Sequence, residues 1–249
     1  MARRPNFVAL ILSLAIVAGG LFAALGWRPL LPGVGLVRSN AGSGAGARYA
    51  APGDAADCGG ERQVDRGGYA FLPLCPGQAP AFDRRYYIVK NAGIGTGVGL
   101  VRGGGGESLA DLAALDTGAP FTLFWSPVDH RFFANQRPEE GRERFHLFAV
   151  RADGLVESPA LGIAARDVLR ARRPCLTDDD IAVSGLRWSR DGRRIALLVY
   201  ARRAGCGGTG NWHLLWMIGD SRTGQIDPQS IRVRRGRSPL PADGPYATL

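Results

Sequence analysis

Apolar side chains occupy both alternating sets of positions along residues 195–200, near the C-terminal end of the chain. The odd positions carry Ile, Leu and Val, and the even positions carry Ala, Leu and Tyr. A strand presents successive side chains to opposite faces of its sheet, so both faces of this strand are apolar. The pattern therefore predicts a sheet that is covered on both sides.

A stretch around a Trp-Ser pair occurs twice in the second half of the chain. Segment 123–134 (LFWSPVDHRFFA) matches segment 186–196 (LRWSRDGRRIA), with Trp125 opposite Trp188. In the second copy, Asp191-Gly192 predicts a tight turn of the kind that joins two antiparallel strands. The first copy reads Val-Asp-His at this point, with one extra residue and no glycine. We expect a hairpin in each copy, with the tryptophans in the core.

A second match lies downstream of each hairpin and places His146 opposite His213. The tryptophans are 63 positions apart and the histidines 67, and this agreement at both ends indicates an internal repeat. Each copy reads as four strands, and a small sheet buried on both faces is typical of a propeller blade. We expect blade-like units at about 120–162 and 185–235. Residues 57–115 could supply a degenerate third unit.

The segment 188–196 (WSRDGRRIA) also resembles a known family of repeats. It is similar to the W-S-P-D-G-x-x-I-A signature of WD40-like (PD40) β-propeller repeats, as in periplasmic propeller proteins of the TolB type, with Arg190 in place of the proline. The resemblance implies a mainly β fold of propeller-type, four-stranded blades. Propellers close with four to eight blades, so two clear copies predict an incomplete propeller. Function does not follow, because such a fold hosts many roles.

One helix is expected within the possible third unit. Ser-Leu-Ala-Asp at positions 108–111 fits a capping box, and Leu109, Leu112 and Leu115 have helical spacing. The pattern predicts a short helix that begins at Ser108.

An apolar run of 19 residues, Phe7–Leu25, follows Arg3 and Arg4 at the N-terminus. A helix of this length spans about 28 Å, close to the hydrocarbon thickness of a bilayer, and the arginines favour a cytoplasmic N-terminus. Residues 1–28 are therefore predicted to be a membrane anchor or signal sequence, and residues 29–56 a flexible Gly/Pro/Ala linker. The β-rich domain, 57–235, would face the periplasm from the inner membrane as a single-pass protein. If the N-terminal segment is cleaved, the domain would be secreted to the periplasm.

The four cysteines are Cys58, Cys75, Cys175 and Cys206. An even number suits an oxidising compartment outside the cytoplasm. Of the three possible connectivities we favour the two local pairings, Cys58–Cys75 and Cys175–Cys206, each of which would stabilise the fold by about 3 kcal/mol. The spacing does not fit a zinc site, which needs CxxC-type pairs.

The formal charge of +9 is concentrated at the two ends of the chain. Residues 1–48 contain five arginines and no acid, and four arginines lie between positions 232 and 237. We predict a basic, disordered tail at 236–249. A nucleic-acid-binding protein carries its basic stripe on the folded face, and the nearly balanced body of this chain argues against such a partner.

No pattern of a nucleophile with its base, of metal ligands or of a cofactor loop emerges from the chain. We therefore predict no catalytic, cofactor-binding or metal residues, and assign structural roles to Trp125, Trp188, His146 and His213 and to the Asp191-Gly192 turn. The function we expect is a non-enzymatic binding or scaffold module of the cell envelope, with an envelope protein or a second copy as partner. The alternative is an exported hydrolase built on the same sheets.

Overall fold

The computed structural model describes residues 62–64, 67–91, 97–138, 142–152, 154–201, 213–234 and 240–249. Within this part of the chain, no helix is both long and apolar enough to cross a membrane. The predicted membrane segment Phe7–Leu25, the linker 29–56, Cys58 and Cys206 lie outside the described residues.

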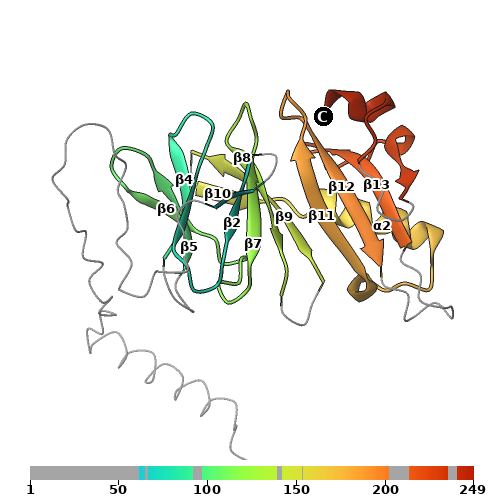
Figure 1. The fold of residues 1–249 in the computed structure, drawn as a ribbon, viewed down its shortest axis with the longest axis horizontal. Helices are drawn as coiled ribbons and strands as arrows, with labels where there is room; N and C mark the ends of the chain where they lie inside the picture. Colours follow the sequence, from blue (N-terminus) through green and yellow to red (C-terminus); the bar gives the residue numbers. More distant parts are fainter. Residues whose placement is uncertain are drawn as a thin grey trace, which may run out of the picture. The chain divides into compact units, whose positions relative to one another are not determined.

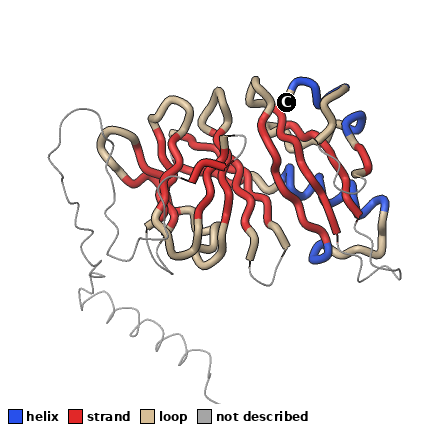
Figure 2. The backbone as a smooth tube through the Cα atoms, in the orientation of Figure 1, coloured by secondary structure: helices blue, strands red, loops and turns tan. Residues whose placement is uncertain are grey.

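The described strands form three antiparallel sheets, and the predicted mainly β class is confirmed (Figures 1 and 2). The first sheet contains β3 (Gly77–Pro80), β4 (Tyr86–Lys90), β5 (Val98–Arg102) and β6 (Ser108–Asp111). The second sheet has the order β1 (Arg62–Val64), β2 (Gly68–Phe71), β7 (Phe121–Trp125), β8 (Arg131–Gln136), β9 (Arg144–Arg151) and β10 (Gly154–Glu157). The third sheet contains β11 (Ile181–Trp188), β12 (Arg194–Ala201), β13 (His213–Asp220) and β14 (Arg232–Val233). Each of these sheets is open.

Each sheet contains a hairpin of the same length with the same closing bond: hairpin 1 (80–87), hairpin 2 (125–132) and hairpin 3 (188–195). In each, the second residue donates its N–H to the carbonyl five positions later. These three bonds, each 2.8 Å long, join Ala81 to Tyr86, Ser126 to Arg131, and Ser189 to Arg194. The extra residue expected in the Trp125 copy is therefore absent, because turn length is set by these backbone bonds and not by the position of the aspartate.

The spacing between hairpins is 45 positions from Pro80 to Trp125 and 63 from Trp125 to Trp188. The longer interval contains the described α-helix, α2 (Ala160–Arg172), between the second and third sheets in sequence. Leu161, Ala165 and Leu169, spaced four residues apart, form its buried face. The helix therefore accounts for a 63-residue period that exceeds the length of one four-stranded unit.

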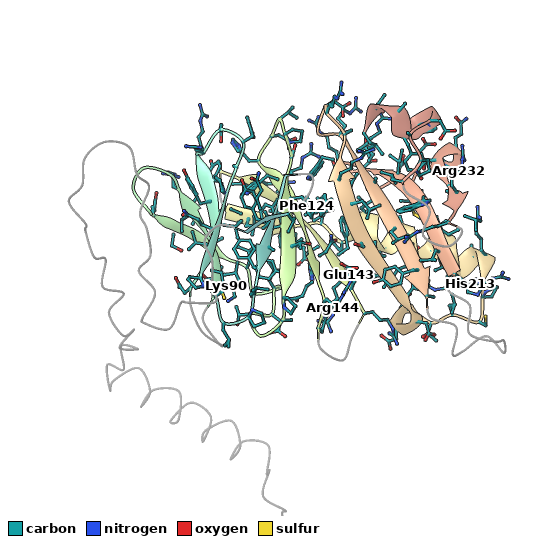
Figure 3. All side chains as sticks on the ribbon, in the orientation of Figure 1. Lys90, Phe124, Glu143, Arg144, His213 and Arg232 are labelled. Carbon is teal, nitrogen blue, oxygen red and sulfur yellow. The ribbon has the colours of Figure 1, made fainter. Side chains whose placement is uncertain are left out.

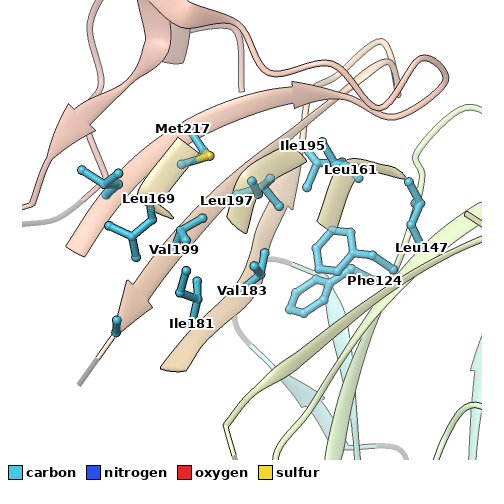
Figure 4. Packing of buried hydrophobic residues seen from close by; sticks show 14 of the residues in the cluster. Phe124, Leu147, Leu161, Leu169, Ile181, Val183, Ile195, Leu197, Val199 and Met217 are labelled. Carbon is cyan, nitrogen blue, oxygen red and sulfur yellow. The ribbon is translucent and has the colours of Figure 1, made fainter. Parts of the chain in front are cut away.

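Both faces of the third sheet are covered, as its alternating pattern predicts. On one face, Ile195, Leu197 and Val199 join a core with α2 and with Phe124 and Phe133 of the second sheet (Figure 4). On the other face, Leu198 lies in a separate cluster formed with the C-terminal segment. Leu198 of β12 is therefore covered by residues 240–249, whereas the Tyr200 hydroxyl donates to Glu143 at 3.0 Å.

The C-terminal segment 240–249 differs from the disordered tail predicted for 236–249. It contains a short 3-10 helix, η5 (Gly244–Thr248), in which Tyr246 is only 1% exposed. The Tyr246 hydroxyl donates to the Ser230 carbonyl at 2.7 Å, and the ring packs with Trp216 and Ile218. Leu240 and Leu249 pack against the same cluster, and this apolar burial favours an ordered segment. The arginines that motivated the prediction of a tail lie before residue 240.

The helix predicted from Ser108 is wrong. Residues Ser108–Asp111 form the edge strand β6, in which Ala110 pairs with Leu100 and Asp111 with Gly99 of β5. The local capping pattern is overridden because this segment completes the backbone hydrogen bonds of the first sheet.

The strand β2 covers the edge of β7 that the internal repeat leaves open, with Tyr69 opposite Leu123 and Phe71 opposite Phe121. The approach requires a glycine at position 68, since a Cβ there would lie 2.3 Å from the Phe124 ring. The chain before hairpin 1 is thereby joined to the second sheet.

Candidate functional site

The three hairpins line one cavity of about 700 Å³. The first three residues of each hairpin contribute to its wall, as residues 80–82, 125–127 and 188–190. The remaining described lining residues are Gly67, Tyr69, Arg84, Phe124 and Arg187. We call this cavity the hairpin pocket; Phe124, on β7, is labelled in Figure 3.

The repeated tryptophans occupy the same structural position in two neighbouring sheets. Trp125 is 9% exposed and donates its indole N–H to the Ala79 carbonyl of the first sheet at 2.9 Å. Trp188 is 8% exposed and donates to the Phe124 carbonyl of the second sheet, also at 2.9 Å. Each tryptophan therefore binds the residue just before the start of the preceding hairpin, and its ring faces the pocket.

Hairpin 3 uses its own polar atoms to hold its turn. Ser189 Oγ donates to Asp191 Oδ1 at 2.5 Å and accepts the Arg194 N–H at 2.9 Å. Bonds from Ser189 and from the Arg193 N–H lower the pKa of Asp191 below its ordinary value. Gly192 has φ 64°, the left-handed conformation that a tight turn requires. The predicted role of Asp191-Gly192 as a hairpin turn is confirmed.

Hairpin 2 contacts hairpin 3 through Arg131. Its guanidinium donates to Asp129, to Ser221 Oγ at 2.6 Å and to the Gly192 carbonyl at 3.1 Å, and it lies 5.9 Å from the centre of the Trp188 ring. Burial acts to raise the pKa of Asp129, but bonds with Arg131 and Ser126 outweigh it and hold that pKa below its usual range. This network ties the two turns together at the rim of the pocket.

Hairpin 1 contacts hairpin 2 through His130. Its Nε2 lies 2.9 Å from Asp83 Oδ2, and its ring packs against Phe82 and, edge-on, against Tyr86. Ser126, the nearest motif serine in sequence, bonds with Asp129 instead. The described residues therefore do not assemble a Ser–His–Asp arrangement here, and His130 acts as a bridge between the turns.

The described wall of the pocket is cationic and aromatic. It contains three guanidinium groups, those of Arg84, Arg187 and Arg190, and no carboxylate among the described lining residues. The rings of Tyr69, Phe82, Phe124, Trp125 and Trp188 form most of the rest. Such a lining favours an anionic ligand with a flat or apolar body.

No protein-family model, curated protein or solved structure matches this chain.

The pocket therefore has to be interpreted from its own chemistry. Among the described residues, no group of three or more His, Cys, Asp or Glu side chains could hold a metal ion.

Two consecutive amides at the end of β8 join the second sheet to the third sheet and to the loop between β6 and β7. Asn135 donates to the Gly185 carbonyl and accepts the Gly185 N–H, both at 2.7 Å, on the edge of β11. Gln136 makes the same pair of bonds with the backbone of Asp116, beyond the first sheet, at 2.6 and 3.2 Å. Neighbouring residues of a strand point to opposite faces, so the two amides bind opposite sides of the second sheet.

The histidines predicted to be equivalent are not. Hairpin registers set Ala149 opposite Arg131 and Asp220 opposite Arg194, which places Met217 at the position of His146. His146 bonds through Nδ1 to Glu157 Oε1 at 2.8 Å, whereas His213 begins β13 opposite Ala201. The similarity of segments 145–148 and 212–215 does not reflect equivalent positions in the two sheets, because the connections that precede β9 and β13 differ in length.

The predicted cysteine pairings stay predictions. Cys75 and Cys175 lie within the described residues and neither is a free thiol, but Cys58 and Cys206 lie outside them. Cys75 belongs to a loop held by Lys90, the only lysine in the chain and fully buried. Lys90 Nζ donates to the carbonyls of Pro73 at 2.6 Å and Cys75 at 3.0 Å, and burial lowers the pKa of this amine. Lys90 therefore stabilises this loop and does not line the hairpin pocket.

Sequence reasoning assigned the tryptophans to the core but missed the pocket that they line. It also missed Arg84, although Asp83-Arg84-Arg85 parallels Asp191-Gly192-Arg193. That parallel was a usable signal for a third copy of the turn. Asn135 and Gln136 carried no such signal, because their partners are backbone groups 50 and 20 residues away.

Proposed function

We propose that this chain is a non-enzymatic binding module of the cell envelope, with the hairpin pocket as its binding site. In this proposal the folded part faces the periplasm behind the N-terminal segment Phe7–Leu25. The apolar run behind two arginines and the even cysteine count support that location.

The three sheets are further proposed to be blades of an open propeller. Three observations support this: hairpins of equal length with the same closing bond, a tryptophan that binds the preceding sheet in two successive copies, and the resemblance of segment 188–196 to propeller repeats. Two elements would take the place of missing neighbours. Helix α2 packs on one face of the third sheet, and the segment 240–249 packs on the other.

The C-terminal segment also repeats the contacts of a following unit. Arg131 of hairpin 2 donates to Ser221 in the third sheet, and Arg194, at the same position in hairpin 3, donates to Thr248 at 2.7 Å. A segment of ten residues thus receives the bond that a further sheet would receive.

The pocket is the observation that carries the binding role. A cavity of about 700 Å³ falls within the range of ligand sites, and its polar wall is confined to a few convergent groups. Its position, at the ends of three hairpins held together by Arg131 and His130, makes it preformed.

The test compares two tryptophan substitutions on hairpin 2 in the full-length chain. Pro127 is exposed and lines the pocket, so Pro127→Trp fills it, whereas Val128 is its exposed neighbour outside the lining, so Val128→Trp is the matched control. Tagged wild type and both variants are used to capture proteins from the protein's own membranes, with quantitative mass spectrometry. We expect partners retained by wild type and Val128→Trp to be lost with Pro127→Trp.

Equal capture by all three proteins would remove the pocket from the binding role. A panel of generic hydrolase substrates, with and without added divalent metals, addresses the alternative class. Turnover that exceeds the blank and is abolished by Pro127→Trp would replace the binding role with a hydrolase.

A further inference from the structure

Arg84 adopts a backbone conformation that arginine rarely occupies. Its φ is 58°, and it is the one non-glycine residue with positive φ in the described part of the chain. Hairpin 3 places Gly192, with φ 64°, at the corresponding position. A side chain in this region costs free energy that glycine would avoid, and such outliers gather at functional sites. Hairpin 1 therefore keeps an arginine at a φ that favours glycine.

Hairpin 3 carries a second arginine at a position that differs among the copies. Arg190 corresponds to Pro127 in hairpin 2 and to Phe82 in hairpin 1, and all three side chains line the pocket. Arg84 and Arg190 are exposed, and neither forms an ion pair with a described residue.

The arginines just outside the pocket differ in this respect. Arg85 pairs with Asp83 at 3.3 Å, and Arg193 pairs with Asp220 at 3.9 Å. Neither lines the pocket. Hairpins 1 and 3 thus each carry a paired guanidinium outside the pocket and one guanidinium without an ion pair in its wall.

The other polar atoms of the motif are already used. The indole N–H groups of Trp125 and Trp188 bind backbone carbonyls, and the hydroxyls of Ser126 and Ser189 bind aspartates. Polar recognition of a ligand by hairpins 1 and 3 is left to Arg84 and Arg190. A group that binds there has to supply acceptors, and a carboxylate matches the guanidinium fork.

The rim of the pocket favours a segment of a larger molecule over an engulfed small one. Phe82 is 50% exposed, and Arg84, Arg190 and Pro127 are exposed as well. Small-molecule sites usually bury most of their ligand, whereas an open rim of aromatic and arginine side chains is typical of a protein interface.

We propose that the hairpin pocket binds an acidic, aromatic peptide segment of a partner protein, with a carboxylate held between Arg84 and Arg190 and the apolar body against Phe82 and the two tryptophans. This inference rests on the proposed binding role of the pocket and names its ligand class. Because the chain carries a formal charge of +9, it attracts any acidic molecule weakly and non-specifically. The test therefore has to distinguish binding at Arg84 and Arg190 from attraction by the net charge.

The experiment uses the full-length chain in mild detergent and fluorescence anisotropy. The probes are a fluorescein-labelled hexapeptide of alternating Glu and Trp, its Gln-Trp counterpart, and inorganic phosphate and succinate as competitors. The variants Arg84→Gly and Arg190→Ala are compared with Arg85→Ala and Arg193→Ala, which remove the same charge from the same hairpins outside the pocket.

We expect the Glu-Trp peptide to bind, and its affinity to fall about 10- to 100-fold in Arg84→Gly and in Arg190→Ala, the range for one lost charge-assisted contact. Arg85→Ala and Arg193→Ala should change it less than about threefold, and binding should weaken with added salt. Arg84→Gly should also unfold at an equal or higher temperature than wild type, because glycine relieves the positive φ. A purely structural role for Arg84 would not combine lost affinity with retained stability.

Three results would overturn the proposal: equal affinity for the Gln-Trp peptide, equal losses in all four variants, or full competition by millimolar phosphate or succinate, which would indicate a small-anion site. In each case the capture experiment with Pro127→Trp remains decisive. If Pro127→Trp still abolishes capture of membrane partners, the proposed binding role holds and the pocket binds another class of ligand. If Pro127→Trp captures the same partners as wild type, the binding role itself is refuted.

Discussion

Replacing the repeated tryptophans measures how strongly the three sheets are joined. Trp125 and Trp188 are each more than nine-tenths buried, and each donates one hydrogen bond to the neighbouring sheet. Truncation of a buried tryptophan to alanine costs about 3–5 kcal/mol, a large share of the roughly 5–15 kcal/mol that stabilises a domain. Replacement by phenylalanine keeps a ring but leaves a carbonyl unpaired, at a cost of about 1–3 kcal/mol.

We therefore expect Trp125→Ala and Trp188→Ala to lower the unfolding midpoint of the full-length chain by similar amounts, about 6–20 °C. The phenylalanine variants should fall between these and wild type. Circular dichroism during heating in mild detergent provides the measurement. Phe82→Ala is the control, because this ring lines the same pocket but is half exposed, and its loss should leave the midpoint unchanged.

Parental midpoints in both alanine variants would refute the packing role, and with it the idea that the repeat joins sheet to sheet. A large loss in one variant alone would refute the equivalence of the two copies. Either result would mean that the indole bonds to Ala79 and Phe124 contribute little to stability.

Four further predictions follow from other contacts. Asn135→Leu should lower the free energy of unfolding by about 2–5 kcal/mol, because it leaves the N–H and the carbonyl of Gly185 without their hydrogen-bond partners. Urea titration measures the loss. A loss below about 1 kcal/mol would mean that these two backbone groups of β11 bond to other partners. Tyr246→Ala should lower the free energy of unfolding by about 3–5 kcal/mol. It should also increase binding of a hydrophobic dye, because it exposes Trp216 and Ile218. Unchanged dye binding would contradict the covering role of residues 240–249. Burial and the neighbouring Glu143 raise the pKa of Tyr200 to about 12. In the unfolded chain this hydroxyl loses its proton at lower pH, so the free energy of unfolding should fall as pH rises from about 10 to 12. Tyr200→Phe should flatten that fall, and an unaltered pH profile in this variant would contradict the prediction. Peptide mapping without reductant should join Cys58 to Cys75 and Cys175 to Cys206, and crossed pairs would disprove the local connectivity.

Local patterns in the chain were enough to predict β12 and the turn that precedes it. The alternation in 195–200 indicated a sheet covered on both faces, and Asp191-Gly192 indicated the turn of hairpin 3. Both predictions hold because they depend on side-chain direction and on backbone conformation within a few residues. The helix α2 was within reach of the same reasoning, through the spacing of Leu161, Ala165 and Leu169, and was missed.

Contacts between distant segments decided the rest. Ser108–Asp111 has a helical cap pattern, yet pairing with β5 makes it a strand, because a strand's hydrogen bonds depend on its neighbour. Hairpin 1 was not predicted, since Pro80-Ala81 replaces Trp-Ser. Its backbone bond and the positive φ of Arg84 establish the third copy of the turn.

The pocket itself could not have been predicted from the order of residues. Its wall takes four residues from hairpin 1 and three each from hairpins 2 and 3. The separation of those hairpins along the chain, 45 and 63 positions, contains no information about their distance in space. The chain determined by itself the strands on either side of Asp191-Gly192 and the turn between them, because their patterns act within a few residues. The tertiary structure alone decided that Arg84 and Arg190 share a cavity, because sheet-to-sheet packing by Trp125, Trp188 and Asn135 brings the hairpins together.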